Sequence, residues 1–384
     1  MNYSSILTTA SIALSLAIPM SSFADSESDE AYAKRAALSK KIKQMREIRR
    51  EMPVPPPSGL FGIYHLPEKG QFVAGINFQN HKFSGLIEGS DSVSAETVVK
   101  TAPNIFFGAP MQPPTLRIVP QSAEANIIFP FINYTVHENF SLVALAPLIS
   151  KKNVLETFNG PGTASLGTTT VKADGLGDIK FGFLYTPLKV HDDKGVRTHN
   201  VILDVVLSAP TGSIDEEDEI LTPANTMMNT RLPYGMQLGS GTWDTLLGVA
   251  YWGKSDKWGW GAQYLATIPL ESENSEGWSY GDKHEGTGWV SYEWKPQLAS
   301  SLRLRHEYQN EIEGMDPKIY GPGLGANPDN YGGTITEFMI GTNWMYKPAR
   351  NLSLELSKPI AQDRNGVQLE KDYSIMISWR NAIF

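Results

Sequence analysis

The sequence predicts an all-β fold: a transmembrane antiparallel up-and-down β-barrel of about 12 strands, preceded by a short N-terminal periplasmic helix. Three observations predict this fold. After an apolar leader, no apolar run approaches the roughly 18 residues that a membrane-spanning helix needs. Apolar and polar side chains alternate with a period of two over most of the chain. Short and long links between the alternating segments take turns, as in closed barrels with an even number of strands.

Residues 1–24 have the organisation of a secretory signal peptide. Ile6–Met20 is an apolar core, and Ser22-Phe23-Ala24 is a small-x-small cleavage site. No Lys or Arg precedes the core, so a buried N-terminal helix is the alternative. The absence of cysteine excludes disulfides, cysteine-bound metals and an N-terminal lipid anchor. The net charge of −8 argues against a nucleic-acid partner, which requires a basic surface.

Residues 25–52 predict a basic amphipathic helix. The segment carries eight Lys and Arg residues and a narrow apolar stripe that includes Leu38, Ile42 and Met45. A Pro-rich linker follows at 53–70, and its prolines end the helix and stiffen the chain. A solvated periplasmic helix is the simplest interpretation. Binding to an acidic partner, pairing with a second copy and plugging the barrel are the alternatives.

Residues 71–384 are assigned to the barrel. In Trp258–Leu270 one face is apolar and aromatic while the other is small or polar, as in a strand between two different environments. The same pattern predicts strands near 71–83, 122–136, 140–152, 176–187, 199–210, 241–252, 258–270, 284–294, 301–313, 333–346, 352–360 and 371–384.

The links between these strands alternate in length. Long links are expected at 84–121, 153–175, 211–240, 271–283, 314–332 and 361–370. Outer-membrane barrels have short periplasmic turns, long external loops and periplasmic termini, so the sequence predicts the outer membrane of a Gram-negative cell, with lipid around the barrel. Trp and Tyr near the strand ends also favour a membrane barrel. A secreted β-sandwich or propeller is the alternative.

Charged residues fall on the strand face opposite the apolar one. They could set the selectivity of a water-filled pore, or pair across strands and seal it. The candidates are Arg303, Arg305, Glu307, Glu311, Asp204, Asp244, Glu337 and Asp372.

The chain ends on Phe384, and a terminal aromatic residue is typical of barrels inserted by the outer-membrane assembly machinery. That machinery is therefore an expected partner of the last strand. Phe384 is out of phase with Tyr373, Ile375 and Trp379, so a β-bulge is expected near 380–382. Without the bulge, Ile383 would be the outward residue.

Four segments carry a resemblance to a known family: Gly175–Tyr185 (GLGDIKFGFLY), Ser208–Asp215 (SAPTGSID), Leu232–Leu247 (LPYGMQLGSGTWDTLL) and Trp258–Gln263 (WGWGAQ). They resemble the outer-membrane β-barrels of a transporter family also described as phenol meta-pathway degradation protein-like. The resemblance covers roughly 71–384, and LPYGMQLGSGTWD is its most specific part. It implies an outer-membrane barrel that passes small hydrophobic or aromatic molecules, and it supports no catalytic residues.

Two loop segments are further candidates. Tyr234, Met236 and Gln237 lie in a Gly- and Pro-rich loop that could fold into the barrel mouth as a constriction, or could pack on the rim. Asp215, Glu216 and Asp218 belong to an acidic run that offers oxygen ligands for a hard cation, although the spacing matches no calcium loop. A solvated external loop is the simpler interpretation of that run.

No motif supports catalysis or a bound cofactor. The chain lacks GxSxG, HExxH and phosphate-binding loops, and no serine is placed for His306 to activate. The sequence therefore predicts a channel or transporter for small, hydrophobic or aromatic solutes. A non-conducting structural or docking protein is the second hypothesis, and an outer-membrane hydrolase is the third.

Overall fold

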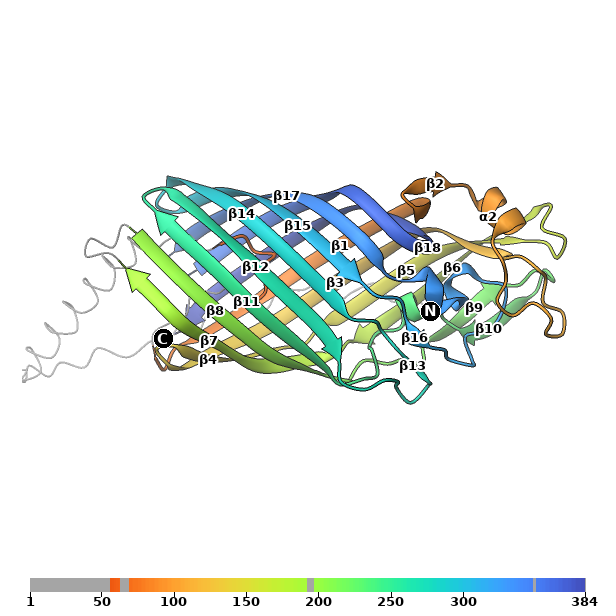
Figure 1. Cartoon of the computed structure of the whole chain (residues 1–384), viewed down its shortest axis with the longest axis horizontal. Coiled ribbons are helices and arrows are strands. Elements are labelled where there is room, and N and C mark those ends of the chain that lie inside the picture. The colour runs from red at the N-terminus through yellow and green to blue at the C-terminus, as the bar shows by residue number, and fades with distance from the viewer. Residues whose placement is uncertain (1–55, 63–68, 192–196, 348–349, 384) are drawn as a thin grey trace, which may run out of the picture. The chain divides into compact units, whose positions relative to one another are not determined.

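The computed structural model describes residues 56–62, 69–191, 197–347 and 350–383. The expected signal peptide at 1–24, the expected helix at 25–52 and the final Phe384 lie outside these ranges. The described chain is mainly β-structure and closes into an antiparallel barrel (Figure 1). No helix in these ranges is long and apolar enough to cross a membrane.

Eleven strand elements form the closed ring, and every neighbouring pair is antiparallel. In order around the ring they are β1 (Phe72–Gly89), β18 (Arg350–Ile383), β17 (Gly333–Lys347), β15 (Leu298–Gln309), β14 (Lys283–Lys295), β12 (Trp258–Pro269), β11 (Asp244–Ser255), β8 (Arg197–Ala209), β7 (Ile179–His191), β4 (Phe140–Leu145) and β3 (Ile118–His137), which pairs with β1.

The last element, β18, contributes two arms to the ring. Residues 350–364 pair with β17, and residues 364–383 pair with β1. The chain reverses at Asn365-Gly366, where Gly366 has φ +54°, and Asn-Gly is the dipeptide that two-residue hairpin turns prefer. The Gln362 Nε2 donates to the Lys371 carbonyl across the hairpin at 3.1 Å. The ring therefore holds twelve strand arms, an even number that lets every neighbour run antiparallel.

Two strands extend past the ring. β4 continues as β5 (Leu148–Phe158), and β6 (Ser165–Leu176) leads directly into β7. β3 pairs in one register with β4 at Phe131–Leu145 and with β5 at Ile128–Leu148, so Pro147, which has no N–H, only interrupts the strand. The expected long loop at 153–175 is therefore wrong, because most of it is a β-hairpin.

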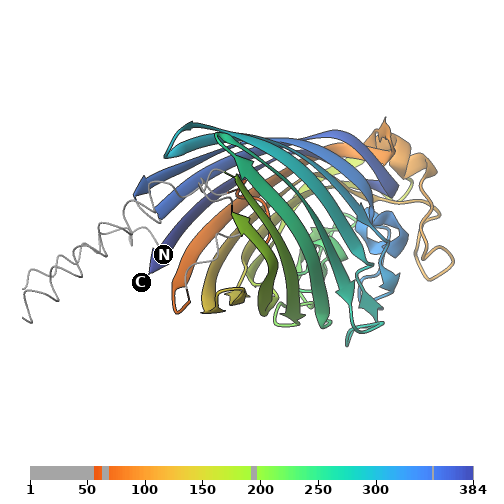
Figure 2. The same cartoon turned by 60° about the vertical axis from the view of Figure 1, so that its left-hand side comes forward.

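The two ends of the barrel differ, as Figures 1 and 2 show. We call the end with the links 138–139, 256–257 and 296–297 the turn end, and the opposite end the loop end. The loop end carries the smaller elements. These are β2 (Asp91–Val93), α2 (Ala95–Thr101), β9 (Glu217–Leu221), β10 (Met227–Arg231), η1 (Tyr234–Met236), β13 (Trp278–Ser279), β16 (Glu313–Gly314), η2 (Leu324–Ala326) and η3 (Pro328–Asn330).

The outer face of the barrel is apolar. Leu302, Leu304 and Ile340 are each about half exposed, as expected for side chains that face hydrocarbon. Trp258, Trp294 and other exposed aromatic residues gather near the turn end, where the Trp379 Nε1 donates to the Tyr346 hydroxyl at 2.8 Å. At the loop end the exposed aromatic residues include Trp243 and Tyr308.

The closing strand pairs without a bulge near its end. The register between β1 and β18 is unbroken from Phe72–Ile383 to Lys82–Tyr373, so the expected bulge at 380–382 is wrong. Trp379 is exposed on the outer face, whereas Arg380 is buried and Ala382 packs against the core inside the barrel. The regular alternation keeps the small Ala382 inside, and the strand has no extra residue to accommodate.

Candidate functional site: the lumen and mouth of the barrel

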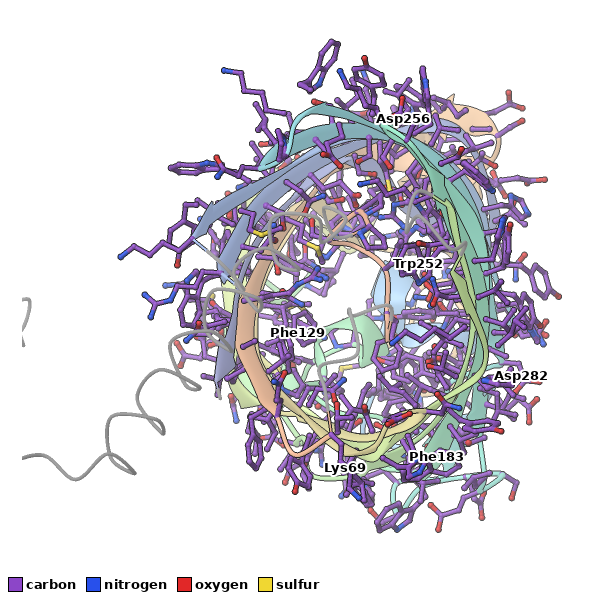
Figure 3. All side chains as sticks on the ribbon, turned by 90° about the vertical axis from the view of Figure 1, so that its left-hand side faces the viewer. Lys69, Phe129, Phe183, Trp252, Asp256 and Asp282 are labelled. Atoms are coloured by element: carbon purple, nitrogen blue, oxygen red, sulfur yellow. The ribbon has the colours of Figure 1, made fainter. Side chains whose placement is uncertain are left out.

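A segment of the Pro-rich linker lies inside the barrel. Pro56–Gly62 runs along the inner wall, and Leu60 is only 2% exposed in a cluster with Phe131, Leu246 and Trp289. Figure 3 looks along the barrel and shows Phe129 and Trp252 on the inner side of the ring that surrounds this segment. The linker thus fills part of the lumen. From the sequence it is expected only to end the helix and stiffen the chain.

Polar contacts fix this lumen segment to the wall. The Gln263 Nε2 donates to the Phe61 carbonyl at 2.5 Å. Gly59 lies so close to the Arg303–Glu355 ion pair that an added Cβ would clash with both side chains. Gly62, with φ +66°, lies equally close to the Asp204 carboxylate. The two glycines allow the backbone to approach the charged wall, as close backbone contacts require.

A network of ion pairs covers the lumen wall formed by β14, β15, β17 and β18. Glu337 is fully buried and binds Arg305, Lys371 Nζ at 2.7 Å and the Ser357 hydroxyl at 2.7 Å. The Arg305 Nη1 also lies 2.8 Å from Glu285 Oε1, and Lys283 Nζ lies 3.2 Å from Glu307 Oε2. Cations and carboxylates alternate across neighbouring strands, which neutralises most of the charge on this wall.

Four other residues that we expected in the lumen do not join this network. Asp204 is 1% exposed, beside Gln263. Asp244 is buried at the loop end and accepts from the Thr242 hydroxyl at 2.6 Å. Glu311 is exposed beyond the end of β15. The pairing of β18 with β1 shifts at Asp372, and Lys371 rather than Asp372 binds Glu337.

An inner cavity of about 310 Å³ lies next to the lumen segment. Its walls include the apolar Leu60, Phe61 and Leu246 together with the charged Lys283, Arg303 and Arg305. This cavity combines apolar and charged walls, so an apolar solute would contact both kinds of surface there.

Three of the segments that carry the family resemblance meet at Asp178. This buried carboxylate accepts from the Gly212 N–H at 2.9 Å and from the Ser240 N–H at 2.8 Å. The Ser240 hydroxyl donates to Asp244 Oδ2 at 3.0 Å, and Gly212 packs directly on Gly239. Asp178 therefore fixes the long loop between β8 and β11 on the barrel rim, and a Cβ on Gly239 would collide with the Gly212 backbone.

The three constriction candidates have different roles within that loop. Gln237 is 1% exposed, and its Nε2 donates to the Leu232 carbonyl at 2.8 Å while its Oε1 accepts from the Glu216 N–H at 2.9 Å. Tyr234 is buried against Trp278, and burial raises its pKa to about 12. Met236 lines a cavity that is described below. Gln237 and Tyr234 thus hold the loop together, and Met236 faces the space that a solute could fill.

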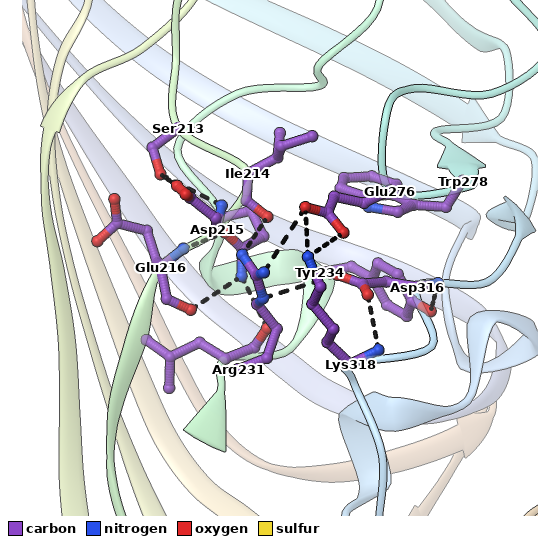
Figure 4. A network of polar contacts seen from close by, with 12 residues as sticks. Ser213, Ile214, Asp215, Glu216, Arg231, Tyr234, Glu276, Trp278, Asp316 and Lys318 are labelled. Atoms are coloured by element: carbon purple, nitrogen blue, oxygen red, sulfur yellow. Dashed lines mark hydrogen bonds and ion pairs between the residues drawn. The ribbon is translucent and has the colours of Figure 1, made fainter. Parts of the chain in front are cut away.

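The acidic run binds protein groups rather than converging on one point. Asp215 accepts from the Ser213 hydroxyl at 2.7 Å, a bond that lowers the pKa of Asp215. Asp218 accepts from the Lys172 N–H at 2.9 Å. Figure 4 shows the neighbouring network, in which Arg231 lies between Glu276 and Asp316. Within the described ranges no group of three His, Asp or Glu residues could hold a metal ion.

An outer cavity of about 850 Å³ lies at the loop end. Loop residues such as Met236, Ile319 and Leu324 form much of its wall, and Phe83 and Leu155 contribute from the strands. Tyr280 and Tyr331 also line it; burial raises the pKa of both hydroxyls, and they donate to the Tyr234 and Gly325 carbonyls. Most of this wall is apolar, which suits a hydrophobic solute.

Sequence reasoning missed three features of this site. Asp178 lies inside the GLGDIKFGFLY segment, but its role as an anchor depends on loops distant in the sequence. Arg364 was placed in an external loop, whereas it lines the outer cavity from β18. The apolar pair Leu60-Phe61 between two glycines was the available signal for the lumen segment.

Comparisons with known proteins concern the fold. No family model and no curated protein matches the chain. The COG4313 outer membrane channel from Pseudomonas putida F1 has 14% identity and a TM-score of 0.51, over 84% of this chain and 98% of its own. A TodX monoaromatic hydrocarbon channel mutant has 10% identity and a TM-score of 0.42, over 83% and 91%.

The CymD monoaromatic hydrocarbon channel has 8% identity and a TM-score of 0.37, over 86% of this chain and 97% of its own. At 14% identity the similarity to the COG4313 channel concerns the fold alone. The fold implied by the sequence resemblance is thereby confirmed: the described chain is a closed antiparallel β-barrel, and its fold is similar to that of this solved barrel.

Proposed function

We propose that the protein is an outer-membrane channel for small hydrophobic solutes, aromatic ones included, and that it is not an enzyme. The observation that carries the proposal is the outer cavity of about 850 Å³, which has a largely apolar wall at the mouth of a closed barrel. Cavities of roughly 300–1,000 Å³ with apolar walls are typical of small-molecule binding sites. The similar solved structure is an outer membrane channel, in agreement with this function.

The proposal includes an orientation. The short links and the end of β18 at Ile383 lie at the turn end, which we assign to the periplasm, and the loop end then faces the exterior. The solute would enter the outer cavity, pass Met236 and the inner cavity, and leave beside the lumen segment Pro56–Gly62. Lipid would surround the apolar outer face, and the outer-membrane assembly machinery would insert the barrel through its last strand.

Uptake of radiolabelled toluene by a Gram-negative host tests the function. Expression of the full chain should raise the initial rate above that of cells with an empty vector. Ala123 lines the outer cavity from β3, so Ala123→Trp should fill the passage and lower the rate at least threefold. Ala262 is exposed on the outer face of β12. Ala262→Trp therefore adds the same side chain outside the barrel and should leave uptake unchanged.

Folding is checked separately, because folded outer-membrane barrels migrate differently from unfolded ones in unheated SDS gels. If folded wild-type protein gives no more uptake than the empty vector, the transport function is wrong. If Ala123→Trp and Ala262→Trp behave alike, a path through the outer cavity is wrong, although transport by another path would stand.

A further inference from the structure

The outer cavity contains one feature that a purely hydrophobic solute would not require. Among the described residues that line it, the only charged side chains are Arg231 and Arg364, and none is acidic. The whole chain carries a net charge of −8. A cationic lining in an acidic protein indicates that the solute itself supplies negative charge.

The two arginines are in different situations. Arg231 is 9% exposed and lies 3.7 Å from Glu276 Oε1 and 3.8 Å from Asp316 Oδ2, so protein carboxylates balance its charge. Within the described ranges no carboxylate lies within 4 Å of the Arg364 guanidinium. Its Nε is buried without a hydrogen-bond partner, as is the Nε of Arg231, and its Nη1 makes one long bond of 3.4 Å to the Gly332 carbonyl.

The carboxylates that act on Arg364 from a distance are Glu307 and Glu337. Lys283 lies 3.2 Å from Glu307, and Lys371 lies 2.7 Å from Glu337, so both carboxylates already bind cations of the lumen wall. Leaving a partly buried guanidinium without a close anion is unfavourable, because hydrogen bonds to charged groups are stronger than those between neutral groups. A solute with its own carboxylate would provide the missing partner.

Polar neighbours of Arg364 already donate to backbone oxygens. Gln368 Nε2 donates to the Gly332 carbonyl at 2.9 Å, and Asn330 Nδ2 donates to the Leu324 carbonyl at 3.1 Å. The Tyr331 hydroxyl donates to the Gly325 carbonyl at 2.9 Å. Arg364 therefore keeps donors for a ligand, whereas these three neighbours already donate to the protein.

We infer that the outer cavity binds amphipathic acids, in which one carboxylate contacts Arg364 and an apolar body lies against residues such as Leu324, Val367 and Leu369. This inference rests on the proposed function and narrows its substrate class from hydrophobic solutes in general to hydrophobic acids. The planar guanidinium matches a carboxylate in two parallel hydrogen bonds, a geometry that a neutral alcohol or hydrocarbon cannot complete.

A matched pair of ligands tests the inference. 3-Phenylpropionate and 3-phenylpropanol share the apolar body and differ in the carboxylate. Their binding to the full chain, folded in amphipol at pH 7, is measured by isothermal titration calorimetry. We expect the acid to bind at least tenfold more tightly, since a charge-assisted contact of about 1.4 kcal/mol corresponds to a factor of ten.

Three variants locate the effect. Arg364→Gln should weaken binding of the acid about tenfold and leave the alcohol unchanged, whereas Arg364→Lys should retain part of the preference. Arg350→Gln removes the same charge from an exposed position at the start of β18, at the turn end, and should change neither affinity. Each variant is first checked for the folded band in an unheated SDS gel.

The outcomes separate the inference from the function on which it rests. Equal affinities of the wild type for acid and alcohol would overturn the inference and leave a hydrophobic channel standing. A preference for the acid that Arg364→Gln and Arg364→Lys do not change would overturn the assignment to Arg364. If neither compound binds the wild type, both the inference and the outer-cavity site for hydrophobic solutes are wrong.

Discussion

Two buried lumen carboxylates illustrate opposite electrostatic situations. Glu337 is fully buried but binds Arg305, Lys371 and Ser357. Asp204 is almost as buried, yet in the described part of the chain no cation lies within 4 Å of it. Removing one partner of a buried ion pair lowers the stability of the fold, because the other charge stays buried without compensation. A buried carboxylate without a cation already lowers the stability before any substitution. The two residues should therefore respond to neutralisation with opposite signs.

Glu337→Gln should destabilise the barrel by roughly 2–3 kcal/mol, below the full value for a dry interior because Arg305 is partly exposed. The change leaves Arg305 and Lys371 facing each other without their shared carboxylate. Urea unfolding, followed by tryptophan fluorescence, measures the loss. Glu124→Gln is the control, because its pair with Lys82 is about one-third exposed and should contribute less than about 1 kcal/mol. Equal losses for the two variants would contradict this account.

Asp204→Asn should raise the stability of the barrel or leave it unchanged. The amide keeps the size of the side chain beside Gly62 and Gly248 while removing the buried charge. The measurement is the temperature at which half of the protein loses the folded band in an SDS gel. A clear decrease in this temperature would show that the Asp204 charge is compensated in the folded barrel.

At the scale of elements, the β18 hairpin closes the barrel, and its turn depends on Gly366. Gly366→Ala should cost more than Gly85→Ala in urea unfolding, although both glycines have positive φ, +54° and +72°. The left-handed backbone costs each alanine about 1–2 kcal/mol. Only at Gly366 would the new Cβ also collide with Asn330, whereas nothing lies within 4 Å at Gly85. Equal losses would mean that the turn can shift away from Asn330.

The lumen segment should regulate flow through the barrel. Leu60→Ala removes the side chain that anchors Pro56–Gly62 in the inner core, a change of about 2–3 kcal/mol for a buried leucine. Weaker anchoring should raise the single-channel conductance in a planar bilayer. Leu304→Ala shortens a leucine on the outer face and is the control. Unchanged conductance in Leu60→Ala would show that this segment does not limit the flow of ions.

The sequence predicts the strands best where they face lipid. Leu302, Leu304 and Ile340 alternate with polar partners because the two faces meet hydrocarbon and lumen, so their period is visible. The hairpin of β5 and β6 lacks this signal, because residues such as Thr168, Thr169 and Thr170 continue the hydrogen bonding without a continuous apolar face. In place of the long loop expected at 361–370, the chain forms a tight hairpin within β18. The Asn365-Gly366 dipeptide was a local signal for that turn.

The site was predictable only in part. Arg305 and Glu337 are both expected on the charged strand face, where charges can pair across strands, and the ladder of β15 and β17 brings them together. Asp372 and Glu311 could not be placed, since a register shift and the end of a strand remove them from the alternating pattern. The lack of a carboxylate beside Arg364 is a property of loop packing, which no local pattern records.

For the whole molecule, two aromatic levels define the thickness of the apolar band. Trp344 pairs with Leu298 at one level, and Tyr308 lies ten residues further along β15 at the other. Ten residues rising 3.4 Å each, tilted near 40°, span about 26 Å, close to the ~25 Å apolar band of outer-membrane barrels. Arg364 and Gln309 lie at or beyond the second level, so the outer cavity projects from the membrane.

Charge placed on this band should cost stability according to depth. Leu304→Arg, midway between the two levels, should destabilise the barrel by about 2–4 kcal/mol in lipid vesicles. Leu270→Arg, beside Trp243 at the loop end, should cost no more than about 1 kcal/mol. Unfolding by guanidinium in phospholipid vesicles gives both values, and equal costs would mean that the band is misplaced.

The separation of the outer cavity from the lumen segment has a kinetic consequence. A solute that loses its water at the loop end, before it reaches the lumen segment, is captured in one step and passed on in another. The rate of uptake should then saturate as the solute concentration rises. The cavity wall would set the half-saturating concentration, and the lumen segment would set the maximal rate. Substitutions in the cavity wall would then change the affinity for the solute, and substitutions at the lumen segment would change the maximal transport rate, each without altering the other.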